Sequence, residues 1–391
     1  MRPLEGIRIL DLTQFVAGPM CTLTLCDLGA EVIKIERPGF GDDTRNETPA
    51  RNGTSAKFIS CNRGKKSIEL NLKDPRQKEI FIGLVKKSDV VVENYKPGTM
   101  KKFGLDYEAL REIKPDIIYA AISGFGQTGP YSSRGALDIA VQAMSGFMSI
   151  TGEKNGKPVK AGTSVADVVA GLYGAIGVLA ALQHKAHTGE GQFVDVAMLD
   201  AMAASVMVNE IARYNTNGIV PVPQGNRHVV SAPFQEFATK DGSIMVCCPT
   251  NAQFKTLMEA LGHTEIYEDP RFKNQQERYQ NKDELEKVMQ PVFAELTTAE
   301  VAAVMAKNGL PFGEINKVSD VAKNEQLIAR DMFIDVEDSK AGSYRTVGFP
   351  LKMQSMPYQP VFRSPVLGED THDVLSQLLD MSDEEITKAF E

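Results

Sequence analysis

The chain has 391 residues, 42% of them hydrophobic and 24% charged, with a formal net charge of −8. This length predicts two or three domains with a large core, and the composition is that of an ordinary soluble globular protein. The acidic balance argues against a nucleic-acid partner. No stretch reaches about 18 uncharged, predominantly apolar residues, so we expect no membrane span, and the N-terminus lacks an apolar signal region, which favours the cytoplasm.

The first half of the chain alternates strand and helix patterns. The apolar runs predict strands at 7–12, 31–36, 67–72, 89–94, 117–123 and 192–196, and helices at about 18–28, 75–87, 164–187 and 198–214. Strands separated by helices of this length predict a parallel sheet with helices on its faces, and therefore an α/β fold.

The second half has a different pattern. The segment 215–225 is a linker by composition. After it we predict an α+β region, with a hairpin over 234–248 and helices to about residue 329. The tail is predicted to be extended over 349–362 and helical over about 371–389.

The cysteines and histidines do not form a recognisable metal or disulfide framework. The five cysteines include no C-x-x-C pair, which favours reduced thiols. His184 and His187 lie three residues apart, but Glu190 does not complete a ligand set with them. We therefore expect no metal site.

Asp167 stands near the start of the long apolar helix, and no other charged residue follows it until Lys185. Aspartate is favoured at helix starts because its side chain accepts backbone N–H bonds there. A lone carboxylate in apolar surroundings is also a candidate for chemistry. The pattern of this segment leaves both interpretations open.

Common catalytic and nucleotide-binding motifs are weak or missing. The stretch 124–129 matches G-x-G-x-x-G, but the loop-like 130–135 follows it where a dinucleotide fingerprint needs a helix. The chain has no G-x-S-x-G, P-loop or H-E-x-x-H sequence. The basic cluster 63–66 fits either a solvated turn or a contact with a phosphorylated small molecule.

Several segments together resemble those of class III (CaiB/BaiF) CoA-transferases. They are 11–19, 29–39, 41–45, 62–70, 92–98, 123–126 and the segment around Asp167. The resemblance implies a Rossmann-like large domain at 1–214 and 335–391 and a smaller α+β domain at 215–334. It also implies a homodimer whose two chains interlock.

The resemblance implies an enzyme that moves CoA from an acyl-CoA donor to a small carboxylic acid. Asp167 would be the nucleophile, passing through an aspartyl anhydride and an aspartyl-CoA thioester. Acyl-CoA and the acid would be substrates, with no tightly bound cofactor. If Asp167 also caps its helix, the helix N-terminus would keep it ionised.

Further residues match CoA-contact positions of the family. They are Val16, Ala17, Arg37, Leu70, Asn71, Leu72, Lys73, Asn94, Tyr95, Lys96, Lys102, Ala136, Leu137 and Asp138. Cations among them suit the phosphates of CoA. Arg227 and His228 are candidates for the carboxylate of the acid substrate, the alternative being a structural turn.

The sequence also bears on three alternative interpretations. Related acyl-CoA racemases carry a catalytic histidine where this chain has Leu137, which cannot shuttle a proton. The formyl-CoA:oxalate branch has glutamine at Val16 and tyrosine at Leu137, so oxalate specificity is in doubt. A CoA-binding subunit without its own chemistry is disfavoured because Asp167 is present.

Overall fold

The computed structural model describes residues 2–354 and 363–391. They form two compact units, the first made of Met1–Met148, Lys160–Val220 and Gln326–Glu391, the second of Ser149–Val159 and Pro221–Glu325. Most of the second unit falls within the segment 215–334, and residues 149–159 also belong to this unit. Part of the predicted extended tail, 355–362, lies outside the described residues.

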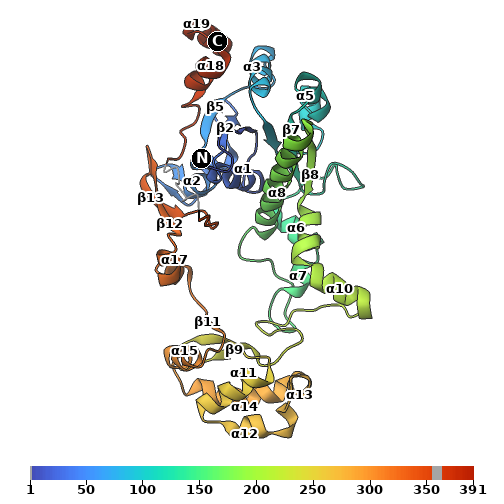
Figure 1. The fold of residues 1–391 in the computed structure, drawn as a ribbon, viewed down its shortest axis with the longest axis vertical. Coiled ribbons are helices and arrows are strands. Elements are labelled where there is room, and N and C mark those ends of the chain that lie inside the picture. The colour runs from blue at the N-terminus through green and yellow to red at the C-terminus, as the bar shows by residue number, and fades with distance from the viewer. Residues whose placement is uncertain (1, 355–362) are drawn as a thin grey trace. The chain divides into compact units, whose positions relative to one another are not determined.

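The first unit is built around a six-stranded sheet (Figure 1). Its strand order is β5-β2-β1-β6-β7-β8, and every neighbouring pair is parallel. The strands are β1 (Arg8–Asp11), β2 (Glu31–Glu36), β5 (Lys66–Glu69), β6 (Val90–Glu93), β7 (Ile118–Ser123) and β8 (Phe193–Ala197). The predicted α/β class and all six predicted strands are confirmed.

Helices connect and cover these strands. Up to β8 they are α1 (Ala17–Asp27), α2 (Ala56–Asn62), α3 (Pro75–Lys86), α4 (Thr99–Phe103), α5 (Tyr107–Ile113), α6 (Asp138–Met144), α7 (Phe147–Ile150) and α8 (Val165–Thr188). Short elements between β2 and α2 are the 3₁₀ turn η1 (Asp43–Asn46) and the strands β3 (Ala50–Arg51) and β4 (Thr54–Ser55). The rest of the unit contains α9 (Met198–Ala201), the π-helical turn η2 (Met202–Val206), α10 (Val208–Asn217), α17 (Glu325–Ala329), β12 (Phe333–Asp338), β13 (Gly342–Val347), α18 (Thr371–Leu379) and α19 (Asp383–Phe390).

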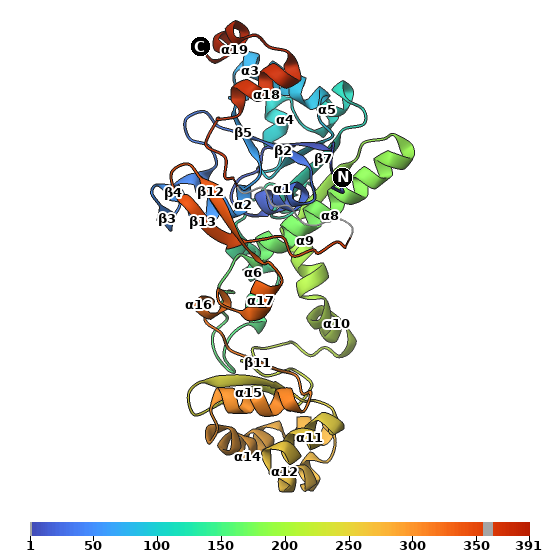
Figure 2. The ribbon, with the colours of Figure 1, turned by 60° about the vertical axis from the view of Figure 1, so that its left-hand side comes forward.

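The strands are buried on both faces because successive side chains alternate between two cores. Ile9, Val90 and Val92 face a core that includes residues of α1 and α8, whereas Leu10 and Val91 face a core that includes residues of α3, α5, α18 and α19. The two C-terminal helices pack against α3, so the end of the chain completes the second core (Figure 2).

Helix α8 lies on one face of the sheet against α1 and β7. A Cβ atom at Gly171 would lie 2.6 Å from the carbonyl oxygen of Ala17, and one at Gly174 would lie 2.7 Å from Ile122 Cδ1. Within the described residues, α8 is the one helix long and apolar enough to cross a membrane by length and composition. In this fold it contributes buried residues to the core, among them Ala170 and Val178.

Two predicted helices are interrupted. The predicted helix 198–214 is divided into α9, η2 and α10, and the Ser205 hydroxyl donates to the carbonyl of Ala201 beside the π turn. Such back-bonding weakens regular helix. The predicted helix 371–389 is two helices because Asp380 is left-handed, with φ 55°, and Ser382 begins a new capping box. The hairpin β12–β13 was not predicted.

Two of the three cations in the basic cluster 63–66 fit neither of its predicted interpretations. Arg63 and Lys65 are 3% and 5% exposed. The Arg63 guanidinium pairs with both oxygens of Asp27, and the Lys65 ammonium pairs with Asp11. These two cations therefore stabilise the interior of the first unit.

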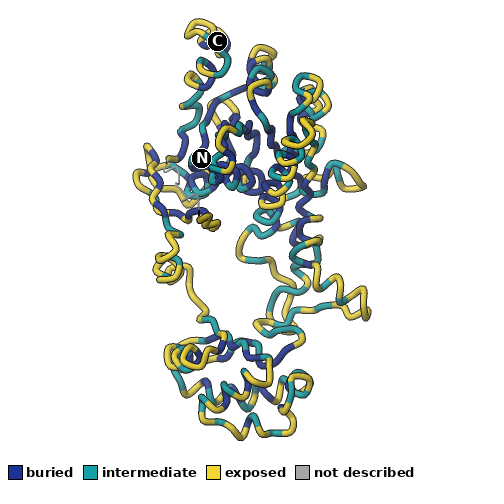
Figure 3. The backbone as a smooth tube through the Cα atoms, viewed as in Figure 1, coloured by how far each residue is buried: buried dark blue, intermediate teal, exposed yellow. Residues whose placement is uncertain are grey.

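The second unit has its own core around a three-stranded antiparallel sheet of order β11-β10-β9. The predicted hairpin is present as β9 (Phe234–Ala238) and β10 (Ser243–Cys247), and β11 (Phe312–Glu314) is an added strand. The other elements are α11 (Asn251–Leu261), α12 (Thr264–Glu268), η3 (Pro270–Phe272), α13 (Gln275–Gln280), α14 (Lys282–Ala294), α15 (Thr298–Lys307) and α16 (Val318–Val321). Buried segments run through each unit, as Figure 3 shows.

Candidate functional site

A cavity of about 680 Å³ lies in the first unit around Asp167. Its walls come from the loop before α1, from Glu47 just after η1, from α2, from the ends of β6, β7 and β8, and from the loops that lead into α6 and α8. The lining residues are Phe15, Val16, Ala17, Glu47, Lys57, Asn94, Ile122, Ser123, Gly124, Ala136, Leu137, Asp138, Ile139, Lys160, Gly162, Thr163, Ser164, Asp167 and Met198. Three strand ends contribute, as expected for a site at the carboxyl edge of a parallel sheet.

Asp167 does not cap α8, although it lies in the first turn of the helix. The N-cap residue is Ser164, whose side chain makes no capping bond. The capping acceptor is Asp138, whose Oδ1 accepts from the backbone N–H groups of Ala166 at 2.8 Å and Asp167 at 3.3 Å. Asp138 Oδ2 accepts from Gln142, which also contacts the backbone of Thr163 and Ala161. Of the two interpretations that the sequence left open, capping by Asp167 is therefore not observed, and the Asp167 side chain lines the cavity.

Burial and the neighbouring Asp138 carboxylate raise the pKa of Asp167 from 3.8 to about 6, while Lys57 and a hydrogen bond from Ser164 act in the opposite direction. The sequence predicted that a helix N-terminus capped by Asp167 would keep this residue ionised. Asp138 supplies the capping bonds instead, and its carboxylate adds a negative charge beside Asp167. Asp167 is still mostly ionised at neutral pH, and it is a stronger base than an ordinary aspartate.

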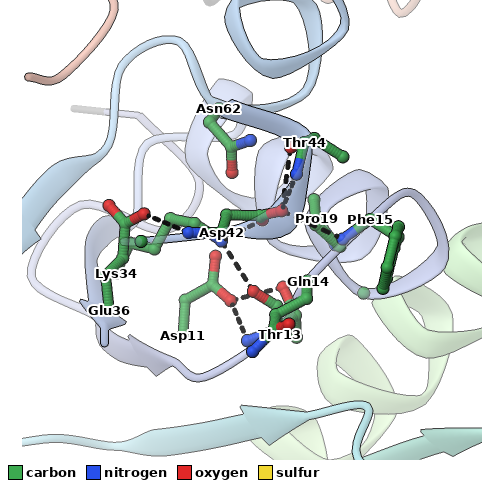
Figure 4. A network of polar contacts seen from close by, with 12 residues as sticks. Asp11, Thr13, Gln14, Phe15, Pro19, Lys34, Glu36, Asp42, Thr44 and Asn62 are labelled. Atoms are coloured by element: carbon green, nitrogen blue, oxygen red, sulfur yellow. Dashed lines mark hydrogen bonds and ion pairs between the residues drawn. The ribbon is translucent and has the colours of Figure 1, made fainter. Parts of the chain in front are cut away.

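A network of buried charges holds the loop that carries Val16 and Ala17 (Figure 4). The Lys34 ammonium donates to the carbonyl of Thr13 at 2.7 Å and pairs with Asp42 at 2.9 Å. Asp42 Oδ1 in turn accepts from the backbone N–H of Phe15 at 3.3 Å. Phe15 is left-handed, with φ 63°, a conformation that non-glycine residues rarely adopt.

The charged groups in this network stabilise one another in their ionised forms. Burial would raise the pKa of Asp11, but the ammonium groups of Lys65 and Lys34 outweigh it and lower that pKa to about 2. Burial would likewise lower the pKa of Lys34, but Asp11 and Asp42 raise it. Both side chains therefore stay charged, and the loop beside Asp167 is fixed by charge-assisted hydrogen bonds.

Asn94 ties the same loop to β6. Its side-chain oxygen accepts from the N–H of Gln14, and its amide nitrogen donates to the Gln14 carbonyl, each at 2.8 Å. This pair of hydrogen bonds satisfies both backbone polar groups of Gln14. Asn94 thus lines the cavity and also holds its wall.

A second cavity, of about 380 Å³, lies at the carboxyl ends of β2 and β5. It brings together six of the predicted CoA-contact residues, namely Arg37, Leu70, Asn71, Leu72, Lys73 and Tyr95. Asn94 lines the first cavity and the adjacent Tyr95 lines the second, so the end of β6 borders both. The Arg37 guanidinium pairs with Asp43 at 2.9 Å and lies 4.6 Å from the centre of the Phe40 ring.

Four predicted residues lie outside both cavities. Lys96 and Lys102 are exposed residues just before and within α4. Arg227 and His228 belong to the second unit, where the Arg227 guanidinium pairs with Asp283 and Glu286. The His228 ring stacks on Phe234 with ring centres 4.6 Å apart. The contacts of both residues fit a structural turn, and their substrate role stays a prediction.

Three charged cavity residues were not predicted, namely Glu47, Lys57 and Lys160. The Lys57 ammonium pairs with Glu47 at 2.7 Å, and Lys160 donates to the carbonyl of Ala161 at 3.0 Å. No sequence motif surrounds these positions. Lysines are mostly exposed on protein surfaces, so the sequence offered no reason to place Lys57 at a site. Within the described residues, no group of three or more His, Cys, Asp or Glu side chains could hold a metal ion.

Comparison with known proteins gives one consistent family. The sequence profile of CoA-transferase family III matches residues 4–371. The chain is 38% identical to the succinyl-CoA:glutarate CoA-transferase of Mus musculus, over 97% of this chain and 87% of that protein. It is 38% identical to the succinate–glutarate CoA-transferase of Agrobacterium fabrum, over 96% of each, and 40% identical to the acetyl-CoA:oxalate CoA-transferase of Acetobacter aceti, over 90% and 89%.

The fold is also similar to that of a solved relative. The crystal structure of a CaiB/BaiF family protein from Brucella suis superposes with a TM-score of 0.87 at 37% identity, covering 96% of this chain and 99% of that one.

Proposed function

The chain belongs to CoA-transferase family III, and on this premise we propose that Asp167 is the covalent carrier that moves CoA from an acyl-CoA donor to a carboxylic acid. The observation that carries the proposal is the position of Asp167. It is a carboxylate freed from capping, lining a cavity beside a loop fixed by buried charges.

The reaction proceeds through four acyl transfers. The Asp167 carboxylate attacks the carbonyl of the donor thioester, which forms a mixed anhydride and releases CoA thiolate. The thiolate attacks the aspartyl carbonyl of the anhydride, which gives aspartyl-CoA thioester and the free donor acid. The acceptor carboxylate then attacks this thioester, and the returning thiolate attacks the acceptor's acyl carbonyl, which yields the new acyl-CoA and restores Asp167.

The geometry of the site supports these steps in two ways. A carboxylate is a weak nucleophile, so the rate depends on holding it against the thioester. The bond from the Asp167 N–H to Asp138 fixes its backbone, and the raised pKa of about 6 makes its ionised form more basic without protonating it at neutral pH. Water must stay out because both intermediates hydrolyse.

CoA would extend from one cavity to the other. The second cavity, with Arg37, Lys73 and Tyr95, suits the phosphates and the adenine, and the first suits the thioester. The two cavities share the end of β6 at Asn94 and Tyr95. This division explains why most of the residues that match CoA-contact positions fall into two groups.

The acids are proposed to be small dicarboxylates. The relatives are named for succinyl-CoA and glutarate, for succinate and glutarate, and for acetyl-CoA and oxalate. Succinate, glutarate and oxalate each have two carboxyl groups, and succinyl-CoA keeps one of them free. The Asp167 cavity contains two lysines, which suit the additional negative charge of such an acid.

An acyl-CoA racemase is the second candidate function. It needs a group that removes the α-proton, and the family's histidine position is occupied here by Leu137, which is 66% exposed. Leu137 favours CoA transfer over proton transfer.

We propose a homodimer in the cytoplasm. Support for a dimer comes from large apolar side chains that the first unit leaves exposed, including Leu172 and Ile176 on α8 and Val208, Ile211 and Tyr214 on α10. Within each helix these side chains are three or four residues apart and share one face, and an exposed apolar face is typical of an interface. Light scattering of the purified protein tests this, and a monomer at micromolar concentration would contradict it.

Trapping with hydroxylamine tests the central proposal. The protein is incubated with succinyl-CoA, treated with hydroxylamine and digested, and the peptide that carries Asp167 is expected to gain a hydroxamate. Asp167→Ala should lose both the adduct and CoA transfer, whereas Asp373→Ala, which alters an exposed carboxylate in α18, should keep them. Transfer by Asp167→Ala would refute the proposal, and exchange of the α-hydrogen with deuterated water would favour a racemase.

A further inference from the structure

The Asp167 cavity contains a charge pair that the proposed reaction does not use. Five charged residues line the cavity, namely Glu47, Lys57, Asp138, Lys160 and Asp167. Asp138 is occupied by the N–H groups at the start of α8, and Asp167 is the proposed carrier. Glu47 and Lys57 bind each other at 2.7 Å, and no step of the reaction requires either of them.

Lys57 projects from a well-anchored helix. The Ser55 hydroxyl accepts from the N–H of Phe58 at the start of α2, and Phe58 is 1% exposed. The Arg45 guanidinium lies 3.7 Å from the centre of the Phe58 ring. The backbone of Lys57 is therefore fixed between two buried contacts.

Glu47 is positioned by a different element. It follows η1 and donates its N–H to the carbonyl of Thr44, whose hydroxyl and N–H bind Asp42. Both side chains of the Lys57–Glu47 pair are 35% exposed, so they are partly desolvated while still reachable from the cavity. Lys57 also lowers the pKa of Asp167, so its charge is felt at the reacting carboxylate.

A dicarboxylic acid brings a second carboxylate into this cavity. One carboxyl group reacts at Asp167. The other loses part of its hydration when it enters the cavity, and this costs free energy unless a cation binds it. The Lys57 ammonium already holds one carboxylate inside the cavity, that of Glu47. A substrate carboxylate has the same charge and the same oxygen geometry as the Glu47 side chain, so it can take that place.

We propose that Lys57 binds the non-reacting carboxylate of a dicarboxylic substrate, and that Glu47 occupies Lys57 when the substrate is absent. This inference rests on the proposed function and names a residue that determines substrate class. Glu47 acts as an internal competitor, so removing its charge and removing the charge of Lys57 have opposite effects.

The test compares each acid with its own monomethyl ester. Oxalate, succinate and glutarate are offered as acceptors with a fixed donor at about pH 8, where Asp167 is ionised, and kcat/KM is measured for each pair. Lys57→Gln should reduce the diacid-to-monoester ratio about 10- to 100-fold for the best diacid, the loss typical of a hydrogen bond to a charged group. Lys57→Arg should restore part of the ratio, and Glu47→Gln should lower the KM of the diacid.

A matched control is Lys66→Gln, because Lys66 and Glu31 form a pair at 2.6 Å of similar exposure outside the cavity. This variant should leave the ratio unchanged. The proposal is overturned if the wild type uses the monoester as well as the diacid, if Lys57→Gln keeps the ratio, or if Lys160→Gln alone lowers it. A hydroxamate on Asp167 in the wild type shows that such a failure concerns Lys57 and leaves the carrier intact, whereas its absence would refute the carrier itself.

Discussion

Asp138 links the stability of α8 to the ionisation of Asp167, and Asp138→Ala should change both. The variant removes the acceptor of two backbone N–H bonds, at 2.8 Å and 3.3 Å. Loss of a side-chain cap costs about 0.5–2 kcal/mol. Because each kcal/mol lowers Tm by about 2–4 °C in domains of 150–250 residues, we expect a decrease of a few degrees.

The same substitution removes a negative charge beside Asp167. The Asp138 carboxylate is the second cause of the raised pKa, after burial, so the pKa of Asp167 should fall below about 6. The acid limb of the profile of kcat/KM against pH should therefore move to lower pH. Asp138→Asn removes the charge and keeps an oxygen that can accept the N–H bonds, so it should move the limb with a smaller loss of stability.

The assay combines thermal unfolding with rates of CoA transfer between about pH 5 and about pH 8. If the acid limb stays in place or moves to higher pH in both variants, the electrostatic coupling between the two aspartates is refuted. If Asp138→Ala melts at the wild-type temperature, the capping role is refuted.

Three further predictions concern the helix contact, the buried network and the carrier. Gly171→Ala places a Cβ atom 2.6 Å from the carbonyl of Ala17, so we expect a loss of about 1–3 kcal/mol in thermal unfolding and a lower kcat as α8 shifts. Lys34→Met leaves its two buried carboxylate neighbours without this cation and should lower the free energy of unfolding in urea by about 3–5 kcal/mol. Asp167→Asn should have a higher Tm than wild type above about pH 6 and the same Tm below about pH 4. The native pKa of Asp167, about 6, exceeds the ordinary value of 3.8, so between these two pH values the native state binds more protons than the unfolded state. The wild-type protein therefore loses stability as the pH rises from about 4 to about 6.

Each of these has a control. Gly313→Ala lies in open space and should melt like wild type, so an equal loss at Gly171 and Gly313 would show that the contact with Ala17 is unimportant. Lys66→Gln breaks a partly exposed pair and should cost less than about 1 kcal/mol; an equal cost for Lys34→Met would contradict the role of burial. If Asp167→Asn has the wild-type Tm at neutral pH, the ionised Asp167 side chain does not lower the stability of the native state.

Local patterns determined most of the first unit. Apolar runs of strand length, separated by helical stretches, were sufficient to predict the six parallel strands, because each strand is buried on both faces and is therefore continuously apolar. The isolated charge of Asp167 in an apolar helix was also visible in the sequence, and its match to the family pattern named a role for it.

Contacts between distant segments decided the properties of the site. The cap of α8 comes from Asp138, 29 residues before Asp167, and no local rule could assign it. Arg63 and Lys65 appeared to be a surface cluster because their partners, Asp27 and Asp11, lie 36 and 54 residues away. Lys57 lines the cavity only because the fold places α2 beside it.

The sequence by itself determined which elements form and which carboxylate is unusual, because hydrophobic periodicity and the isolation of a charge are local properties. The tertiary structure decided the pKa of that carboxylate, the cation beside it and the burial of Arg63 and Lys65. These depend on desolvation and on Coulomb interactions between side chains that only the fold brings together.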